Sequence, residues 1–398
     1  MRNRAIGIYI SVPFCRSKCT YCNFASGVYP ASDHARYVNR LIEDLEGAGD
    51  WATKLGLDLP RCADTVYLGG GTPSLLEPEQ IGRLFAALRS TFQLDSDAEI
   101  TVECAPGQLA QPVLDEMVAV GVNRVSLGVQ SFVDEEARQS GRLHSRAVVL
   151  QDLKRLRASG ISNLNLDLIA GLAGQTFASW EESLDVLLDC GVPHASVYML
   201  EVDEDSRLGR EMLAGGTRYR AGLVPTDDAI ARMYETAVPR LESAGLQQYE
   251  ISNFARAGFE SRHNLRYWQR RPYVGVGLDA SSMLREREGS FVLRASTNDD
   301  LKAYLAGDRA RETAWLNLER QLEEAWFLGL RTSAGVEIAA LEEEFGAEVT
   351  GASIAVADKL VEDQMLSRGG GRFRLTSRGR MVSNDVFQEF LAEPENVS

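Results

Sequence analysis

The sequence predicts an α/β protein: a partial (β/α)6 barrel of the TIM-like kind, followed by a mainly helical C-terminal domain with a winged-helix-like end. Two observations predict this class. Short apolar strands alternate with amphipathic helices through the first 200 residues, and six such units are too few to close an eight-fold barrel. Beyond residue 298 helical patterns dominate, with a glycine-rich hairpin near the end.

The expected strands are short and rich in β-branched residues, and they cover residues 6–12, 65–68, 99–103, 124–129, 163–169 and 196–200. The helical patterns between them cover residues 33–55, 78–92, 111–120, 134–140, 145–158 and 177–190. Strand and helix repeats of this kind build a parallel sheet, whose chemistry lies at the C-terminal ends of its strands. Polar and glycine-rich segments follow the expected strands, so we expect them to share one face.

The second half of the chain has a different pattern. Residues 203–226 are charged and are expected to form a long connection or lid before a helix at 227–244. Strands and turns are expected at 249–283, a hairpin at 365–375 and a last helix at 379–391. The expected domains are 1–226 for the barrel core with its lid connection, 227–297 for an extension of the barrel, and 298–398 for the C-terminal domain.

Charge and cysteine content narrow the functional classes. The chain has 42 basic and 57 acidic residues, a net charge of −15, which disfavours contact with nucleic acid. No apolar stretch approaches the roughly 18 residues of a membrane-spanning helix. The apolar run that starts at Ala5 has no signal-peptide cleavage site after it, and we expect a buried strand there. Six cysteines are too few for a secreted disulfide framework, so we expect a reducing, cytoplasmic setting.

Three of the cysteines, Cys15, Cys19 and Cys22, lie on the loop after the first expected strand, with Arg16 and Lys18 beside them. Thiolates bind soft metals, and nearby cations lower thiol pKa values. Iron-sulfur clusters usually take four cysteines, so three would leave one iron open to a further ligand. The alternatives are a zinc site completed by a distant residue, or three ordinary thiols. Zinc modules pair two such motifs, and no histidine pair or second cysteine pair has that spacing here.

The cysteine motif, with Tyr21 before its last cysteine and the GGGTPS loop at 69–74, resembles the radical S-adenosylmethionine superfamily. Further motifs are SLGVQSF at 126–132, NLDLIAGL at 165–172, YEISNFA at 249–255 and HNLRYW at 263–268. Together they resemble the oxygen-independent coproporphyrinogen III oxidase-like family, and within it the HemW-type heme chaperones. The resemblance extends over essentially the whole chain, with a C-terminal domain of the HemN type.

The resemblance implies a [4Fe-4S] cluster on Cys15, Cys19 and Cys22, whose fourth iron is chelated by the amino and carboxylate groups of S-adenosylmethionine. The cofactor residues that it implies are Tyr9, Tyr21, Gly70, Gly71, Thr72, Glu103, Gln130, Arg142 and Asp167. Glycine lets the backbone approach the methionine end, and the polar side chains would bind its amino acid and ribose. Taken alone, a glycine triplet also fits an ordinary turn, and a barrel carboxylate also fits a structural ion pair.

Phe24 bears on which member of the family this is, because coproporphyrinogen dehydrogenases have a cysteine there. The first expected strand also begins near Met1, without the N-terminal extension of the dehydrogenases. Both observations favour a heme chaperone that delivers heme to apoproteins such as respiratory enzymes, with peripheral membrane association and a homodimer as further expectations. His263, in the HNLRYW motif, resembles the heme-ligating residue of that group. The alternative is a structural histidine beneath Trp268.

A second function stays open at this point: a radical enzyme that acts on a porphyrin, such as an oxygen-independent coproporphyrinogen III dehydrogenase. We assign no catalytic residue. A third, nucleic-acid modification, is disfavoured by the net charge. The family pattern Glu-x-Asn-Pro after the third strand is here Glu103-Cys104-Ala105-Pro106. The carboxylate is kept, while one hydrogen-bonding amide is lost near the expected cofactor.

Overall fold

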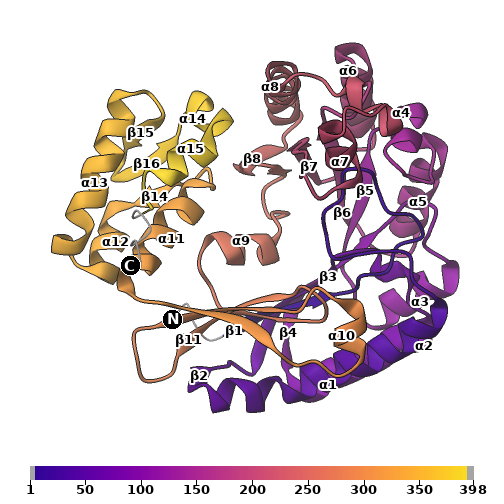
Figure 1. Cartoon of the computed structure of the whole chain (residues 1–398), viewed down its shortest axis with the longest axis horizontal. Coiled ribbons are helices and arrows are strands. Elements are labelled where there is room, and N and C mark those ends of the chain that lie inside the picture. The colour runs from indigo at the N-terminus through magenta and orange to yellow at the C-terminus, as the bar shows by residue number, and fades with distance from the viewer. Residues whose placement is uncertain (1–4, 392–398) are drawn as a thin grey trace.

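A computed structural model describes residues 5–391 of the chain. Its centre is a set of parallel strands in chain order (Figure 1), and these are β1 (Ala5–Ser11), β3 (Cys62–Gly69), β4 (Gln93–Cys104), β5 (Arg124–Gln130), β6 (Asn163–Ala170) and β7 (His194–Met199). These are the six expected strands. Their near-continuous burial is typical of a parallel sheet that is covered on both faces.

Helices cover the outer, convex face of this sheet (Figure 1), and these are α1 (Ala31–Lys54), α2 (Pro78–Thr91), α3 (Gln111–Ala119), α4 (Asp134–Gln139), α5 (Arg146–Ala158) and α6 (Phe177–Asp189). Each corresponds to an expected helix. Helix α2 shows why these segments begin where they do: Pro78 occupies its first turn, and Glu77 forms a capping box with Gln80. The partial (β/α)6 barrel predicted from sequence is confirmed.

The sheet extends beyond both edges of this barrel. Beside β1 lies β10 (Tyr273–Val276), and the pairing continues through β11 (Ser281–Glu286), β12 (Val292–Thr297) and β13 (Arg311–Leu316). Short β2 (Leu57–Asp58) also pairs with β11. At the other edge, β9 (Asn253–Ala255) and β8 (Gln247–Glu250) add antiparallel strands to β7. Among the described residues the two ends of this path do not pair, so the barrel stays open.

Strand β13 was not predicted from the sequence. Most of its side chains are exposed, and its sequence RETAWL lacks the alternation of apolar and polar residues that marks a half-buried strand. It is an edge strand whose pairing with β12 comes from the backbone.

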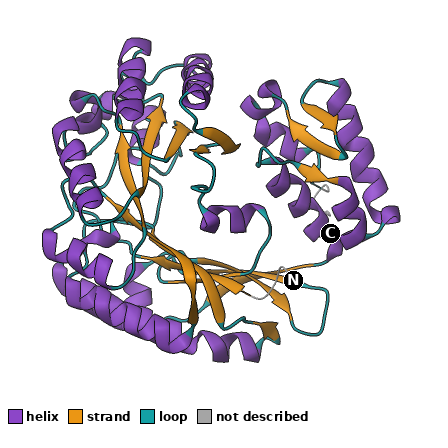
Figure 2. Cartoon of the chain, turned by 180° about the vertical axis from the view of Figure 1, so that it is seen from behind, coloured by secondary structure: helices purple, strands orange, loops and turns teal. Residues whose placement is uncertain are grey.

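One helix lies inside the curve of the sheet, as both views show (Figures 1 and 2). It is α9 (Arg262–Trp268), in a region where sequence analysis expected strands and turns. The Ser261 side chain caps its N-terminus by accepting a hydrogen bond from the Asn264 amide. Arg266 of α9 is fully buried beside Gly7, where a Cβ would lie only 2.4 Å from the arginine Cδ. Glycine in β1 therefore makes room for this helix.

The expected connection at 203–226 contains two short helical segments, α7 (Arg207–Leu213) and η2 (Arg218–Leu223), and leads to α8 (Asp227–Ser243). This connection contacts the cysteine loop: the Leu208 amide donates to the Thr20 carbonyl at 2.8 Å, and Asn23 donates to Asp203 at 2.9 Å. The connection therefore helps to hold the loop that carries the thiols.

The C-terminal region is mainly helical. Its elements are α10 (Leu301–Leu305), α11 (Leu318–Leu330), β14 (Val336–Glu337), α12 (Ile338–Phe345), α13 (Ala347–Glu362), β15 (Leu366–Gly369), β16 (Arg372–Leu375), α14 (Ser377–Met381) and α15 (Ser383–Gln388). From α11 onward the region forms a core of its own, which includes Trp326 and Phe390, stacked with ring centroids 4.6 Å apart. By contrast, Leu301 and Tyr304 of α10 pack in the barrel core. The expected hairpin is present as β15 and β16. The expected last helix is instead two short helices, because the backbone leaves helical geometry at Val382.

No helix within residues 5–391 combines the length and the apolar character that crossing a membrane requires.

Candidate functional site

A cavity of about 310 Å³ lies at the C-terminal ends of the parallel strands. Every cofactor residue predicted from sequence lines it except Tyr9 and His263. The predicted residues that line it are Cys15, Cys19, Tyr21, Cys22, Gly70, Gly71, Thr72, Glu103, Gln130, Arg142 and Asp167. Residues from Cys15 to Asp167 therefore meet at the face of the sheet where parallel α/β folds have their active sites.

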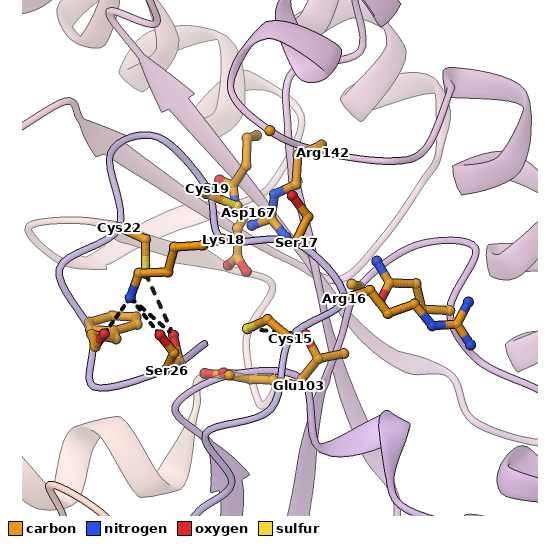
Figure 3. A pocket seen from close by; sticks show the side chains of 18 of the residues that line it. Cys15, Arg16, Ser17, Lys18, Cys19, Cys22, Ser26, Glu103, Arg142 and Asp167 are labelled. Atoms are coloured by element: carbon orange, nitrogen blue, oxygen red, sulfur yellow. Dashed lines mark hydrogen bonds between the residues drawn. The ribbon is translucent and has the colours of Figure 1, made fainter. Parts of the chain in front are cut away.

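The cysteine loop is fixed by backbone and side-chain hydrogen bonds, and Figure 3 shows those between Lys18 and Ser26. At its start the Cys15 amide donates to the Gly27 carbonyl at 2.8 Å. Inside the loop the Lys18 ammonium donates to the Ser26 carbonyl at 2.9 Å, and also to the Phe24 carbonyl. The Thr20 amide donates to the Ser140 carbonyl at the end of α4. These bonds give the loop one defined path.

The three thiols surround part of the cavity without converging on one point. No group of three or more His, Cys, Asp or Glu side chains in residues 5–391 is arranged to hold a single metal ion. A cubane cluster differs from such an ion, since each thiolate binds a different iron. Hydroxyl groups lie near two of the sulfurs, Thr72 Oγ1 at 3.9 Å from Cys15 and Ser26 Oγ at 3.9 Å from Cys22. This donor set fits a [4Fe-4S] cluster with one open iron.

Bare backbone forms the wall next to Cys15. A Cβ on Gly71 would lie 2.7 Å from the Val12 carbonyl oxygen, and Gly70 has a left-handed φ of 90°. The Thr72 amide also donates to the Phe14 carbonyl at 2.8 Å. These glycines therefore let the loop pack closely against the end of β1, and they leave no side chain between the loop backbone and the cavity.

Two carboxylates face the thiols from the strands (Figure 3). Burial raises the pKa of Glu103 to about 7, although Tyr67 donates a hydrogen bond to its Oε1 at 2.8 Å. Burial also raises the pKa of Asp167, whose oxygens accept from Ser126 at 3.1 Å and from Asn165 at 2.7 Å. Buried carboxylates that keep a free face toward a cavity can bind an ammonium group or sugar hydroxyls.

Two buried polar atoms beside these carboxylates lack a protein partner. They are Oε1 of Gln130 and Nε of Arg142. Gln130 also has φ 69°, a strained conformation for a residue with a side chain, and such strain concentrates at functional sites. A Cβ on Gly128 would lie 2.9 Å from the Arg142 guanidinium, so glycine makes room for it. The Arg142 guanidinium also donates to the Tyr21 hydroxyl at 3.2 Å, so its free Nε and the free amide oxygen of Gln130 remain to bind a ligand with hydroxyl and carboxylate groups, such as S-adenosylmethionine.

Several residues of the site were not predicted as part of it. Ser126, Gly128 and Tyr198 line the cavity, and Gly141 packs against the cysteine loop, since its Cβ would lie 3.2 Å from Cys19 Cα. Ser126 and Gly128 belong to the SLGVQSF motif, which gives a sequence signal for them. Tyr198 has no comparable signal. Cys104 and Ala105, the departures from the family pattern, also line the cavity, and burial raises the pKa of the Cys104 thiol to about 12.

Tyr9 lies beneath the cavity wall instead of lining it. Its hydroxyl is 3.2 Å from where a Cβ on Gly70 would be, and its ring lies 6.2 Å from that of Tyr67. It therefore supports the glycine loop from below.

The His263 side chain, on α9, is exposed neither to solvent nor to the cavity of the cysteines. Nδ1 is 2.9 Å from Thr65 Oγ1 and Nε2 is 2.8 Å from the Tyr267 hydroxyl. Burial lowers the pKa of the imidazole to about 3, so the ring is neutral. In this conformation both nitrogens are hydrogen-bonded, which does not fit ligation of heme iron.

Comparisons with known proteins agree with this geometry. Residues 9–187 match the Radical SAM superfamily, and residues 316–382 match the HemN C-terminal domain. A protein named Heme chaperone HemW from Bacillus subtilis (strain 168) is 34% identical over 387 residues, covering 97% of this chain and 99% of the relative. The chain belongs to the HemW family. A second HemW, from Escherichia coli (strain K12), is 30% identical over 98% of both chains.

The solved structure of coproporphyrinogen III oxidase (HemN) from Escherichia coli, a radical SAM enzyme, is also similar to this HemW-family chain. The TM-score is 0.80 at 22% identity, covering 98% of this chain and 91% of the other. This confirms the fold over both the barrel and the C-terminal region. Phe24, which follows the last cysteine of the motif by two positions, lines the cavity and is 62% exposed. An apolar ring thus stands at the mouth of the site.

Proposed function

We propose that this protein binds heme and delivers it to apoproteins such as respiratory enzymes, and that it carries a [4Fe-4S] cluster with bound S-adenosylmethionine. The observation that carries the proposal is the similarity to HemW proteins over nearly the whole chain, including both the barrel and the C-terminal domain. The exposed Phe24 beside the thiols supports the same assignment. The proposal places the protein in the cytoplasm, with homodimer formation and peripheral membrane association as further parts of it.

Cys15, Cys19 and Cys22 would hold the cluster, with Thr72 and Ser26 beside two of the sulfurs. When bound, the cluster supplies an electron donor and an open iron for the methionine end of the cofactor. Arg142 would bind the cofactor carboxylate, because a guanidinium matches that group. Glu103, next to the glycine loop, would take the ammonium, while Asp167 and Gln130 would take the ribose hydroxyls. Tyr21 lines the cavity and would pack against the cofactor.

Heme is the cargo in this proposal, and His263 is its proposed axial ligand. A neutral imidazole is the form that binds iron, and His263 is neutral. Binding requires that one nitrogen leave Thr65 or Tyr267, so the proposal includes a movement of α9. The HemW-type motif around His263 supports this assignment.

Anaerobic heme titration tests the assignment. Wild-type protein and the His263→Ala variant would be titrated with heme, and binding would be followed by visible absorbance. His194→Ala is a matched control, because His194 is also fully buried and bonded at both nitrogens, to Asn165 at 2.6 Å and to Tyr249 at 2.9 Å. We expect loss of heme affinity in His263→Ala alone. Unchanged affinity and stoichiometry in that variant would remove His263 as the ligand.

A turnover assay separates the chaperone from the dehydrogenase. Reconstituted protein would be incubated with coproporphyrinogen III, a reductant and S-adenosylmethionine, and in parallel heme-loaded protein would be mixed with an apo-hemoprotein. We expect heme transfer without porphyrinogen conversion. Stoichiometric protoporphyrinogen formation would overturn the chaperone proposal.

A further inference from the structure

One tyrosine connects the cavity of the thiols to the helix of the HNLRYW motif. Tyr67, on β3, donates its hydroxyl hydrogen bond to Glu103 Oε1 at 2.8 Å. Its ring packs on the imidazole of His263, with centroids 5.3 Å apart and an angle of 29° between the planes. Glu103 lines the cavity, whereas His263 is buried in α9. Tyr67 therefore contacts both groups at once.

The His263 ring has a single defined position beneath Tyr67. Thr65 and Tyr267 hold its two nitrogens at 2.9 and 2.8 Å, and its backbone amide donates to Glu99 Oε1 at 3.0 Å. All of these partners lie within the half-barrel, on β3, β4 and α9 itself. Moving the imidazole alone breaks its bond to Thr65 on β3 or to Tyr267 on α9, and shifting the backbone of α9 also breaks the bond to Glu99 on β4.

On the cavity side, Tyr67 and Glu103 fit closely against bare backbone. A Cβ on Gly69 would lie 2.9 Å from Tyr67 Cε1 and 3.0 Å from Glu103 Cδ. The Gly70 amide also donates a hydrogen bond to Glu103. The direction of the carboxylate therefore depends on the Tyr67 hydroxyl on one side and on the glycine loop on the other.

We propose that Tyr67 and His263 act together as positioning residues for Glu103, so that the affinity for S-adenosylmethionine depends on the place of the His263 ring. The ammonium of the cofactor requires a carboxylate that is aimed at the glycine loop. Removing the Tyr67 hydroxyl releases Glu103 directly, and removing the imidazole releases the Tyr67 ring that carries this hydroxyl. Both changes therefore weaken the same hydrogen bond, the one from the Tyr67 hydroxyl to Glu103.

This link has a consequence that rests on the proposed function. Both nitrogens of His263 are bonded, so ligation of heme iron moves the ring away from Thr65 or Tyr267, and with it from Tyr67. Heme then weakens the binding of S-adenosylmethionine, and S-adenosylmethionine weakens heme binding by the same factor.

A four-protein comparison tests the link without heme. S-adenosylmethionine would be titrated calorimetrically into anaerobically reconstituted wild type, Tyr67→Phe, His263→Ala and the double variant. We expect about a tenfold loss of affinity for Tyr67→Phe, the usual cost of a lost bond to a buried charged group. The double variant should be no weaker than the weaker single variant. Additive losses, or unchanged affinity in either single variant, would overturn the link.

A control variant and a replacement variant show whether the loss of cofactor affinity is specific to Tyr67 and His263. Tyr304→Phe is the control, since Tyr304 is a buried tyrosine that is bonded to Asp44 away from the cavity. The affinity of this variant for S-adenosylmethionine should equal that of wild type. His263→Gln replaces His263→Ala if that variant does not fold.

A positioning role also moves the pH midpoint of cofactor binding upward in Tyr67→Phe, because the Tyr67 hydrogen bond lowers the pKa of Glu103. A purely structural role would leave that midpoint unchanged.

The heme arm repeats the cofactor titration with one equivalent of heme bound, as judged by visible absorbance. Weaker cofactor binding in wild type, with no such change in Tyr67→Phe, supports the antagonism. Bound heme with unchanged cofactor affinity overturns it. Protein that retains no heme overturns the proposed function instead, and the four-protein comparison still decides the link between Tyr67 and His263.

Discussion

The ammonium of Lys18 donates a hydrogen bond of 2.9 Å to the carbonyl of Ser26, across the loop that carries the three thiols. The charged side chain of Lys18 thus joins two parts of the loop as a structural crosslink would. It connects the segment between Cys15 and Cys19 to the segment after Cys22. The arrangement of the thiols therefore depends on a residue that is not expected to touch iron.

Replacing Lys18 with methionine should reduce cluster incorporation. Methionine keeps the length of the stem and removes the donor, and a hydrogen bond from a charged group contributes about 1.5–3 kcal/mol. Iron and sulfide per chain, measured after anaerobic reconstitution, should fall. Lys154→Met, on the exposed surface of α5, is the control and should incorporate iron like wild type. Equal iron content in both variants would contradict the role of Lys18.

Affinity for S-adenosylmethionine should fall as the pH drops below about 7. The Glu103 carboxyl has a pKa of about 7, raised chiefly by burial, so it is increasingly protonated below that value. Binding the cofactor ammonium requires the carboxylate and thus releases a proton, which costs up to tenfold in affinity per pH unit. Above pH 7 the affinity should be flat. Calorimetric titrations from pH 6 to 8 measure this.

The ionisable groups around Glu103 come from several elements, and these are Tyr9, Tyr67, Cys104, Arg142, Asp167, Tyr198 and Tyr267. Glu103→Gln cannot titrate, so it should bind the cofactor weakly and without this pH dependence. A pH dependence that persists in Glu103→Gln would point to Asp167 instead.

Removing the hydroxyl beside a thiolate should make the cluster harder to reduce. Thr72 Oγ1 and Ser26 Oγ each lie 3.9 Å from a sulfur, and hydrogen bonds to sulfur stabilise the more negative, reduced cluster. Thr72→Val and Ser26→Ala should therefore shift the reduction potential to more negative values in an anaerobic redox titration. Ser90→Ala, on α2 away from the cavity, should leave the potential unchanged. A positive shift would contradict the assignment.

Adding one methyl group to Gly71 should destabilise the fold. Its Cβ would lie 2.7 Å from the Val12 carbonyl oxygen, and relieving such overpacking costs about 1–3 kcal/mol. Gly49→Ala is a matched control within α1, where a Cβ meets nothing within 4 Å, and it should stabilise the protein by about 0.5–1 kcal/mol. Chemical denaturation measures both. Equal stability of the two variants would rule out a packing role for Gly71.

The barrel and most of the cavity could be predicted because their signals are local. Apolar runs such as that of β1 mark buried strands, and the residues that follow them must meet at one edge of a parallel sheet. The place of α9 could not be predicted. Its sequence HNLRYW carries no clear helical periodicity, and its position inside the sheet depends on contacts such as that of Arg266 with Asp64.

Tyr67 was missed for a related reason. Within its strand it looks like an ordinary core residue, and only the structure brings its hydroxyl to Glu103 and its ring to His263. Tyr9 was predicted as a cofactor residue from the family resemblance, yet it lies beneath Gly70. In both cases the sequence indicates the strand, but the contacts of the side chain depend on residues that are distant in the sequence.

Helix α9 lies against the inner face of the partial barrel, although it comes late in the chain. Its Arg266 donates a hydrogen bond to the Ala5 carbonyl, 261 positions earlier in the sequence. During synthesis, β1 leaves the ribosome long before the segment that covers it. Until that segment is made, Asp64 on β3 lacks its ion-pair partners Arg266 and Arg271. Contacts of such long range slow folding and prolong exposure of the unfinished sheet. A nascent chain that stops before residue 262 should remain dependent on holding by other cellular factors, even though all six barrel strands have already been made.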